Sequence, residues 1–215
     1  METDPNTGLD SAQYSTWTGD GWTVVGSFTE LGLQSVSCLS RSFCMAIGET
    51  TTPITGGNIN QSGIAMLWNG SSWAQSVVVG GIGLPLISCA TSDFCMAVGG
   101  FHASGDIYTI WNGSQWSPVS QEDAGIGLSP VGFDSVSCPS ASLCVATDGG
   151  SGVNSQPSTD GPPVVYLWQA GSWSGTPEET ETQAAIPGGS FSEVSCPSVT
   201  YCVIAGDGQY LTGTA

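Results

Sequence analysis

The chain has 215 residues, of which 18 are acidic and one is basic, and its formal net charge is −17. This length suits one domain with a sizeable core. Because no basic patch exists, electrostatics would oppose binding to nucleic acid or to an anionic membrane surface. No apolar run reaches the length of a transmembrane span. We therefore expect no nucleic-acid partner and no membrane insertion.

Cysteines and tryptophans form two alternating series of pairs along the chain. The first cysteines of successive pairs are 51, 49 and 58 residues apart, and no cysteine or tryptophan lies outside a pair. This spacing predicts a repeat of about fifty residues. The C-x5-C pairs are Cys38/Cys44, Cys89/Cys95, Cys138/Cys144 and Cys196/Cys202; the W-x4-W pairs are Trp17/Trp22, Trp68/Trp73, Trp111/Trp116 and Trp168/Trp173.

Taken in chain order, the repeats cover residues 15–32, 33–84, 85–132, 133–190 and 191–215 of a single domain, 1–215. The first is a tryptophan hairpin alone, and the last is built around a cysteine hairpin. Each complete repeat reads as four strands, such as LQSVSC, FCMAIG, IAMLW and SSWAQSVVV. The strand segments are rich in β-branched and aromatic residues. The Asn-Gly step between the third and fourth strands predicts a type I′ hairpin turn, with positive φ at both residues.

Repeated four-stranded units of this length are typical of β-propeller blades. We predict an all-β propeller of about four four-stranded blades. The SCPSxxxC hairpin followed by a WNGSxW hairpin also resembles a repeat family found in secreted, propeller-like proteins of actinobacteria and related bacteria. That resemblance covers nearly the whole chain. It implies the fold and export of the protein, and no single activity.

The two incomplete repeats predict how the ring could close. The first hairpin would supply strands three and four of a blade whose strands one and two come from the last cysteine hairpin. However, both AQYSTW (12–17) and GQYLTG (208–213) resemble a third strand. This redundancy leaves open a segment of a larger ring, or a ring completed by another chain. Self-association through an open blade edge is therefore a further hypothesis.

The cysteine spacing favours structural disulfides. C-x5-C across a tight turn places two sulfurs on neighbouring antiparallel strands. Zinc sites prefer shorter spacing and converging pairs, and redox cysteines prefer C-x-x-C with nearby positive charge. We expect one disulfide per blade and no metal or cofactor. Disulfides persist in oxidising compartments, so we expect a secreted or cell-surface protein.

Candidate ligand-binding residues lie on the loops that follow the second and fourth strands, at the end opposite the cysteine and tryptophan turns. Such variable loops on a rigid scaffold often carry function. The tryptophan pairs could stack on sugar rings, but their presence in every repeat favours packing between blades. The loop candidates are Asn60, His102, Asp106, Asp148 and Asp160.

The function predicted first is a non-catalytic extracellular binding module for a glycan or a surface protein. A structural component of a surface layer, filament or larger exported protein is the alternative. A glycoside hydrolase is the second alternative, because that reaction needs only two carboxylates and aromatic subsites. A multi-histidine metal site is excluded, since His102 is the one histidine.

Overall fold

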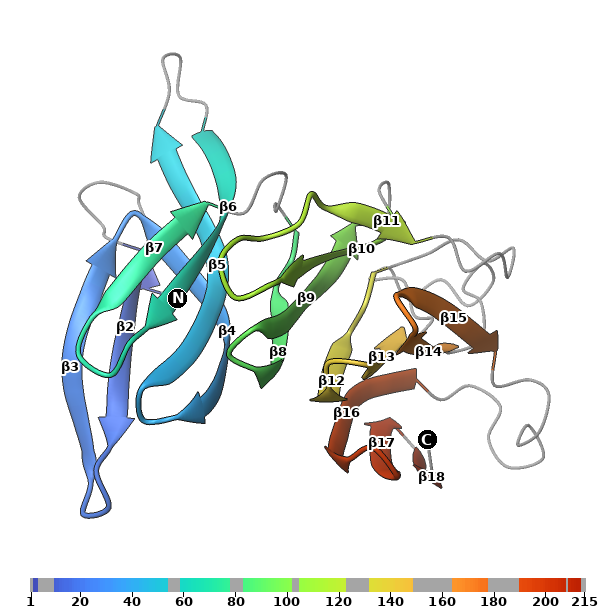
Figure 1. The fold of residues 1–215 in the computed structure, drawn as a ribbon. Helices are drawn as coiled ribbons and strands as arrows, with labels where there is room; N and C mark the ends of the chain where they lie inside the picture. The colour runs from blue at the N-terminus through green and yellow to red at the C-terminus, as the bar shows by residue number, and fades with distance from the viewer. Residues whose placement is uncertain are drawn as a thin grey trace.

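The computed structural model describes residues 2–3, 10–53, 59–77, 83–101, 105–122, 132–148, 164–177, 190–207 and 209–213. These residues form five antiparallel sheets, as Figure 1 shows. Within these ranges no helix is long and apolar enough to cross a bilayer. The predicted all-β class with propeller-type blades is confirmed.

Three sheets are complete four-stranded meanders, in which each strand pairs with the next along the chain. They are blade 1, with β4 (Leu31–Ser40), β5 (Phe43–Pro53), β6 (Ile59–Trp68) and β7 (Trp73–Val77); blade 2, with β8 (Leu86–Thr91), β9 (Phe94–Phe101), β10 (Gly105–Trp111) and β11 (Ser120–Glu122); and blade 3, with β12 (Ser135–Ser140), β13 (Leu143–Asp148), β14 (Val164–Gln169) and β15 (Ser172–Pro177).

The cysteine and tryptophan spacings set the register within each blade. Cys38 lies directly opposite Cys44, and Cys44 in turn lies opposite Trp68 on the third strand. Trp68 faces Trp73 on the fourth strand. Four disulfides are present, with Cα–Cα distances between 3.9 and 4.1 Å. The cysteine turn and the tryptophan turn therefore lie at the same end of the blade.

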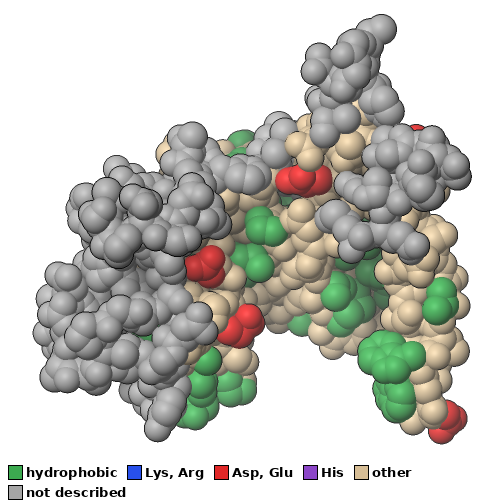
Figure 2. Space-filling model, turned by 180° about the vertical axis from the view of Figure 1, so that it is seen from behind, with side chains coloured by type: hydrophobic (Ala, Val, Ile, Leu, Met, Phe, Trp, Pro, Cys, Tyr) green, Lys and Arg blue, Asp and Glu red, His purple; other side chains and the backbone are tan. Residues whose placement is uncertain are grey.

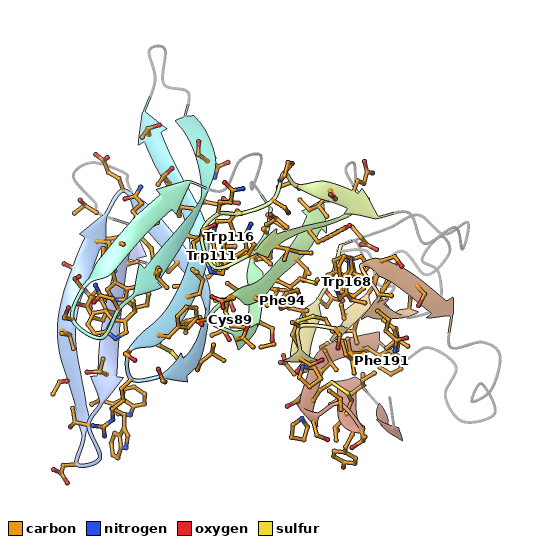
Figure 3. All side chains as sticks on the ribbon, viewed as in Figure 1. Cys89, Phe94, Trp111, Trp116, Trp168 and Phe191 are labelled. Atoms are coloured by element: carbon orange, nitrogen blue, oxygen red, sulfur yellow. A yellow bond between two sulfur atoms is a disulfide. The ribbon has the colours of Figure 1, made fainter. Side chains whose placement is uncertain are left out.

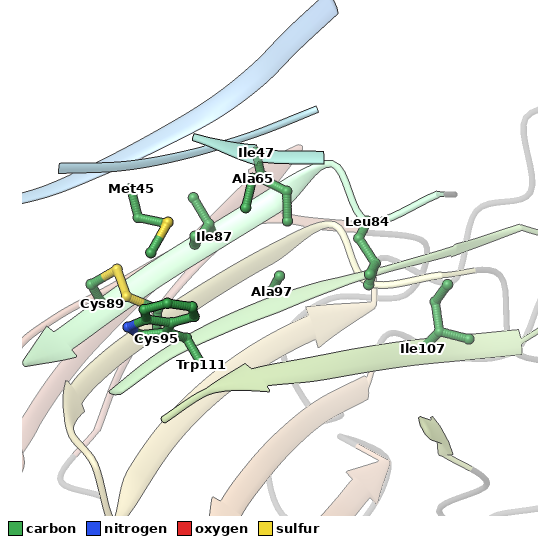
Figure 4. Packing of buried hydrophobic residues seen from close by; sticks show 10 residues of the cluster. All are labelled: Met45, Ile47, Ala65, Leu84, Ile87, Cys89, Cys95, Ala97, Ile107 and Trp111. Carbon is green, nitrogen blue, oxygen red and sulfur yellow. A yellow bond between two sulfur atoms is a disulfide. The ribbon is translucent and has the colours of Figure 1, made fainter. Parts of the chain in front are cut away.

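The blades stack through their first two strands. β4 lies against β8, β8 against β12, and β12 against β16. Figure 4 shows the cluster between blades 1 and 2, where Met45 and Ile47 of β5 meet Ile87 and the Cys89–Cys95 disulfide of blade 2. Equivalent clusters join blade 2 to blade 3 and blade 3 to the last sheet. The core is thus a series of similar interfaces between neighbouring blades.

The two terminal sheets have three strands each, and they remain separate from one another. The ring closure expected from the sequence, with both termini in one blade, is therefore not what the structure has. In Figure 1 the sheets follow a curve, with β2 and β3 at one end and β16–β18 at the other. The first sheet contains β1 (Glu2–Thr3), β2 (Asp10–Trp17) and β3 (Trp22–Thr29); the last contains β16 (Ser190–Ser198), β17 (Tyr201–Asp207) and β18 (Gln209–Gly213).

The predicted type I′ turn at Asn-Gly is wrong, although the hairpin itself is present. Gly70 has a φ of 97°, but Asn69 does not have positive φ. Instead, the Asn69 side-chain oxygen accepts hydrogen bonds from the backbone N–H groups of Ser71 and Ser72, which caps a four-residue loop. The residues with positive φ in adjacent positions are Ala170 and Gly171, at 52° and 88°. The local side-chain cap overrides the dipeptide preference.

Candidate functional site: an open blade face and an exposed tryptophan hairpin

A ladder of serine hydroxyls joins each cysteine hairpin to the next one. The backbone N–H of Cys89 donates to Ser37 Oγ at 3.0 Å, and that of Cys138 donates to Ser88 Oγ at 2.9 Å. The N–H of Cys196 donates to Ser137 Oγ at 2.9 Å. In every case the serine directly precedes the first cysteine of its own blade. We call this series the serine ladder; it links blade 1 to blade 2, blade 2 to blade 3 and blade 3 to the last sheet.

Apolar side chains of the second strand accompany the ladder. Met45, Met96 and Val145 each follow the second cysteine of their blade, and each is almost completely buried against the next cysteine hairpin. Aromatic contacts repeat in the same way: Tyr108 of β10 meets the tryptophan pair of blade 3, with ring centroids 5.4 and 6.0 Å from Trp168 and Trp173. Each blade therefore covers the front face of the blade that follows it.

Blade 1 presents part of its front face to solvent. Val36 is 59% exposed, whereas its equivalent in blade 2, Ile87, is 7% exposed. Cys38 is exposed as well, while the first cysteines of the later hairpins are all buried. The cause is the composition of the first sheet, which packs on blade 1 as strands three and four of a blade do. Tyr14 of β2 meets Trp68 and Trp73 at 6.1 and 5.8 Å, but no cysteine hairpin of the described chain lies over Val36. We call this surface on β4 the open front face.

The last sheet presents the opposite, back face. Tyr201 is 45% exposed, although its equivalent in blade 3, Leu143, is buried. Val203 is half-buried and Ala205 is exposed, where Met45 and Ile47 are fully buried in blade 1. Ser195, which directly precedes Cys196 as the ladder serines precede their cysteines, is also exposed. We call this surface of β16 and β17 the open back face.

The first tryptophan pair is exposed, and it differs in this respect from the others. Trp17 and Trp22 are 56% and 72% exposed, and the neighbouring Val24 and Val25 are exposed as well. Figure 2 shows hydrophobic side chains gathered at the tip of the β2–β3 hairpin, at the lower right. The two indole rings contact each other at 5.8 Å with an interplanar angle of 56°. This hairpin and the open front face are both exposed apolar surfaces at the first sheet and its junction with blade 1.

The other tryptophan pairs lie within the stack. Trp111, Trp168 and Trp173 are buried, and Trp68, Trp73 and Trp116 are half-buried. Figure 3 shows Trp111, Trp116 and Trp168 on their strands. The first indole of a pair donates to a carbonyl in the cysteine turn, as Trp68 does to Arg41 and Trp111 to Ser92, both at 3.0 Å. These hydrogen bonds lie within one blade, whereas Tyr108 of blade 2 packs on Trp168 and Trp173 of blade 3. Trp17 has no cysteine turn of the described chain beside it, because its sheet lacks strands one and two.

The predicted ligand-binding residues on the loops are only partly described by the structure. His102, Asp160 and the side chain of Asn60 lie outside the described residues. Asp106 and Asp148 are described, and both are buried. No three histidine, cysteine, aspartate or glutamate side chains of the described part of the chain gather in a group suited to a metal ion. Burial leaves neither aspartate presented to a polysaccharide in solution.

The cysteines singled out from the sequence are structural, and in blades 2 and 3 they form no part of a surface that a ligand could reach. Cys95 and Cys144, the second cysteines of these blades, have an exposed fraction of 0%. Cys144 lies opposite Trp168 on the third strand and belongs to the apolar cluster that also contains Met96 of blade 2. The Cys138–Cys144 disulfide therefore joins β12 to β13 inside the stack of blades.

Asp106 holds a joint between blades. Its carboxylate accepts a hydrogen bond from the backbone N–H of Gly132, which leads into blade 3, at 3.2 Å. Glu49 does the same one blade earlier, accepting from the N–H of Gly83 at 2.9 Å. Both glycines have positive φ, 106° and 82°. Because the contact repeats, we assign both carboxylates a structural role: they hold the chain where it passes from one blade to the next. The sequence alone predicts Asp106 as a ligand-binding residue.

Sequence reasoning also missed the residues of the two open faces. Their signal was present in the sequence, because a serine precedes the first cysteine of all four pairs: Ser37, Ser88, Ser137 and Ser195. A second signal is Val24, which stands where blades 1, 2 and 3 have Gln75, Pro118 and Gly175. A β-branched apolar residue on one hairpin, at a position where none of its repeats has one, indicates an interface.

No known protein family and no curated protein matches the chain in sequence. Among solved structures, the chain is similar to one described as "YCF48 bound to D1 peptide", with 13% sequence identity and a TM-score of 0.48. That likeness covers 92% of this chain and 70% of the other.

Proposed function

We propose that the protein is a non-catalytic extracellular binding module that takes another protein on the open front face and the exposed β2–β3 hairpin. The observation that carries this proposal is the exposure of Trp17, Trp22, Val24 and Val36 in a fold that buries most of its other large apolar side chains. Exposed apolar surface of this kind is typical of interaction sites. Tryptophan is also among the residues most enriched where binding energy concentrates.

The shape of this surface favours a protein partner. Along Gln13–Trp17, β2 pairs only with β3 in the described part of the chain, so one edge of the strand is available. An extended segment can add to such an edge and bury its side chains on the neighbouring apolar surface. The cysteine hairpins of blades 1 to 3 fill the equivalent place next to their own third strands. The surface is therefore built to take a β-strand or a β-hairpin.

A glycan is the second candidate ligand, and the exposed tryptophan pair favours it. Indole faces that reach solvent can stack on sugar rings. However, Trp17 and Trp22 are tilted by 56° to each other, so they do not present one flat platform. The valines beside them offer a sugar no hydrogen bonds. We therefore place the glycan second.

An extracellular setting is supported by the cysteines of the chain. All eight form disulfides. Disulfides form and persist in oxidising environments. The net charge of −17 further favours a soluble, non-adhesive surface outside the binding site. The proposed binding site, in contrast, is apolar. A partner could therefore bind there although the rest of the surface repels other acidic molecules.

The proposal is tested by screening the purified chain against a displayed library of secreted proteins and against a glycan array. We expect protein ligands whose binding falls about tenfold or more in a Trp17→Ser/Trp22→Ser variant, the loss typical of central interface residues. Gln75→Ser is the control, because it changes an exposed residue at the place on blade 1 that Val24 has on β3. Glycan binding with the same sensitivity would support the second candidate. Ligands that bind the variant and the native chain equally would refute the proposed site.

A further inference from the structure

The first and last sheets are complementary parts of one blade. The first has strands three and four with a tryptophan pair, and it lacks a cysteine hairpin. The last has strands one and two with the Cys196–Cys202 disulfide, and it lacks a fourth strand. Each sheet thus contains the strands that the other is missing, apart from β18, which occupies the place of a third strand.

β18 has the sequence and register of β2. Gln209-Tyr210-Leu211-Thr212-Gly213 in β18 matches Gln13-Tyr14-Ser15-Thr16-Trp17 in β2 at three of five positions. In β18, Gly213 lies opposite Cys202. In blade 1 the residue opposite the second cysteine is a tryptophan, Trp68. β2 in place of β18 would restore this tryptophan, because Trp17 would then lie opposite Cys202.

Replacing β18 by β2 of a second copy would also bring the two open faces into contact with each other. With β17 beside β2, β16 would lie against β4 as β8 lies against β12. Ser195 Oγ would then accept from the N–H of Cys38 and extend the serine ladder by one step. Val203 and Ala205 would pack against Val36 and the exposed disulfide of blade 1, as Met45 and Ile47 pack against blade 2.

We propose that β16 and β17 of one copy of this chain complete the half-blade β2–β3 of a second copy, with β2 replacing β18 in the register Cys202 opposite Trp17. The proposal rests on the proposed function, since it uses the same surface and names its occupant. β1 can stay in place, because it pairs with Asp10 and Ser11, beyond the segment that β17 would cover. The result is a chain of copies in which every junction is a whole blade.

A second copy suits this surface better than the same chain's own end. Three complete blades separate the two terminal sheets, which lie at opposite ends of the curve in Figure 1. The apolar clusters and the serine ladder hold those blades in a fixed relation. The paired surfaces are mainly apolar or hydroxyl-bearing, with the exposed Glu193 opposite Ala205 on the open back face, whereas the whole chain carries −17. Repulsion between copies should therefore weaken association at low salt, and screening should strengthen it.

The first experiment measures the mass of the full chain by sedimentation equilibrium over a range of concentrations and salt. We expect a monomer–oligomer equilibrium that shifts toward oligomer as salt rises. Val36→Ser should weaken it about tenfold or more, as for a central apolar contact. Leu39→Ser is the matched control, because Leu39 is an exposed apolar residue at the turn end of the same strand, where the register shifts after Cys38. Leu211→Pro should strengthen association, since proline weakens the pairing of β18 with β17.

The second experiment tests the register with thiol crosslinking. Thr16→Cys in one sample and Val203→Cys in another are mixed and treated with dibromobimane, which bridges thiols only a short distance apart. We expect a crosslinked heterodimer from this pair, and far less from Gln13→Cys mixed with Val203→Cys, which is three residues out of register. Carrying Thr16→Cys and Val203→Cys in one chain shows whether the link forms within a copy or between copies.

Three results would overturn the inference: a monomer at all concentrations and salts, equal crosslinking of both mixtures, or a link within one copy. A monomer that still loses library ligands in the Trp17→Ser/Trp22→Ser variant would overturn the self-association alone and leave the protein-binding function standing. If no library ligand depended on Trp17 and Trp22, but the chain formed a salt-dependent oligomer with the expected register, the self-association would stand and binding of other proteins would be refuted.

Discussion

Ser88→Ala removes one step of the serine ladder without changing the volume of a core. The Ser88 hydroxyl accepts a hydrogen bond from the Cys138 N–H at 2.9 Å, and Cys138 is 6% exposed. In the alanine variant this N–H keeps its place between blades 2 and 3 but has lost its acceptor. The junction of blades 2 and 3 is therefore weakened, while each blade keeps its own strand pairing and disulfide.

The size of the effect follows from the burial of the donor. Leaving a buried polar group unsatisfied costs about 1–3 kcal/mol. For a domain of this size, each kcal/mol lowers Tm by about 2–4 °C. Ser88→Ala should therefore lower Tm by about 2–12 °C. Ser195→Ala is the matched control, because Ser195 also directly precedes the first cysteine of its pair but is exposed. Its effect should be within about 0.5 kcal/mol, as for an ordinary surface substitution.

Differential scanning calorimetry on dilute samples measures both variants under conditions that keep the chain monomeric. Circular dichroism checks that the strand content is unchanged, so that a loss of Tm reports the junction between blades. Equal destabilisation by the two alanine substitutions, or no loss in Ser88→Ala, would refute the assignment of the ladder as a stabilising link. At concentrations where copies associate, Ser195→Ala should begin to lower Tm as well.

Three further outcomes are expected. Gly99→Ala should prevent normal folding, because its methyl group would collide with the Gly83 carbonyl and the Pro85 ring, which lie just before the first strand of the same blade. Gly21→Ala meets no atom within 4 Å and should be tolerated; expression yield and Tm test the pair. Under mild reductant, Cys38–Cys44 should open first, since Cys38 is exposed and the first cysteines of the other three disulfides are buried, and mass spectrometry after alkylation gives the order. Asp106→Ala should lower the free energy of unfolding by about 1–3 kcal/mol, because it leaves the buried N–H of Gly132 without its acceptor. Asp106→Asn keeps an acceptor oxygen and should lower it less. A urea titration measures both variants.

Local spacing predicted the blades well, and the physical reason is visible in the disulfides. A sequence separation of six between cysteines on paired strands leaves room for one tight turn, so C-x5-C determines both the hairpin and its register. The W-x4-W pairs determine the third and fourth strands in the same way. By contrast, the Asn69 turn depends on side-chain hydrogen bonds in its own loop, which a dipeptide rule does not contain.

Closure and the site were harder to predict, because they depend on contacts between repeats. The sequence has the same residues before Cys38 and before Cys138, yet one valine is exposed and the other half-buried, according to what precedes the blade in space. Likewise, Trp17/Trp22 and Trp111/Trp116 have the same spacing in the sequence, but the first pair is exposed and the other lies within the stack of blades. Comparing equivalent positions between repeats, as for Val24 and Gln75, was the available route to the open faces.

The serine ladder also has a direction. Each cysteine hairpin offers a side-chain acceptor on one face and a backbone donor on the other, so successive blades are related head to tail. A two-fold dimer would place acceptor against acceptor, or donor against donor, and could not extend the ladder. Only a heterologous contact continues it, and such contacts either close into a ring or grow without limit. The rotation that relates one copy to the next therefore determines whether an assembly of this chain stops at a fixed number of copies or becomes a fibre.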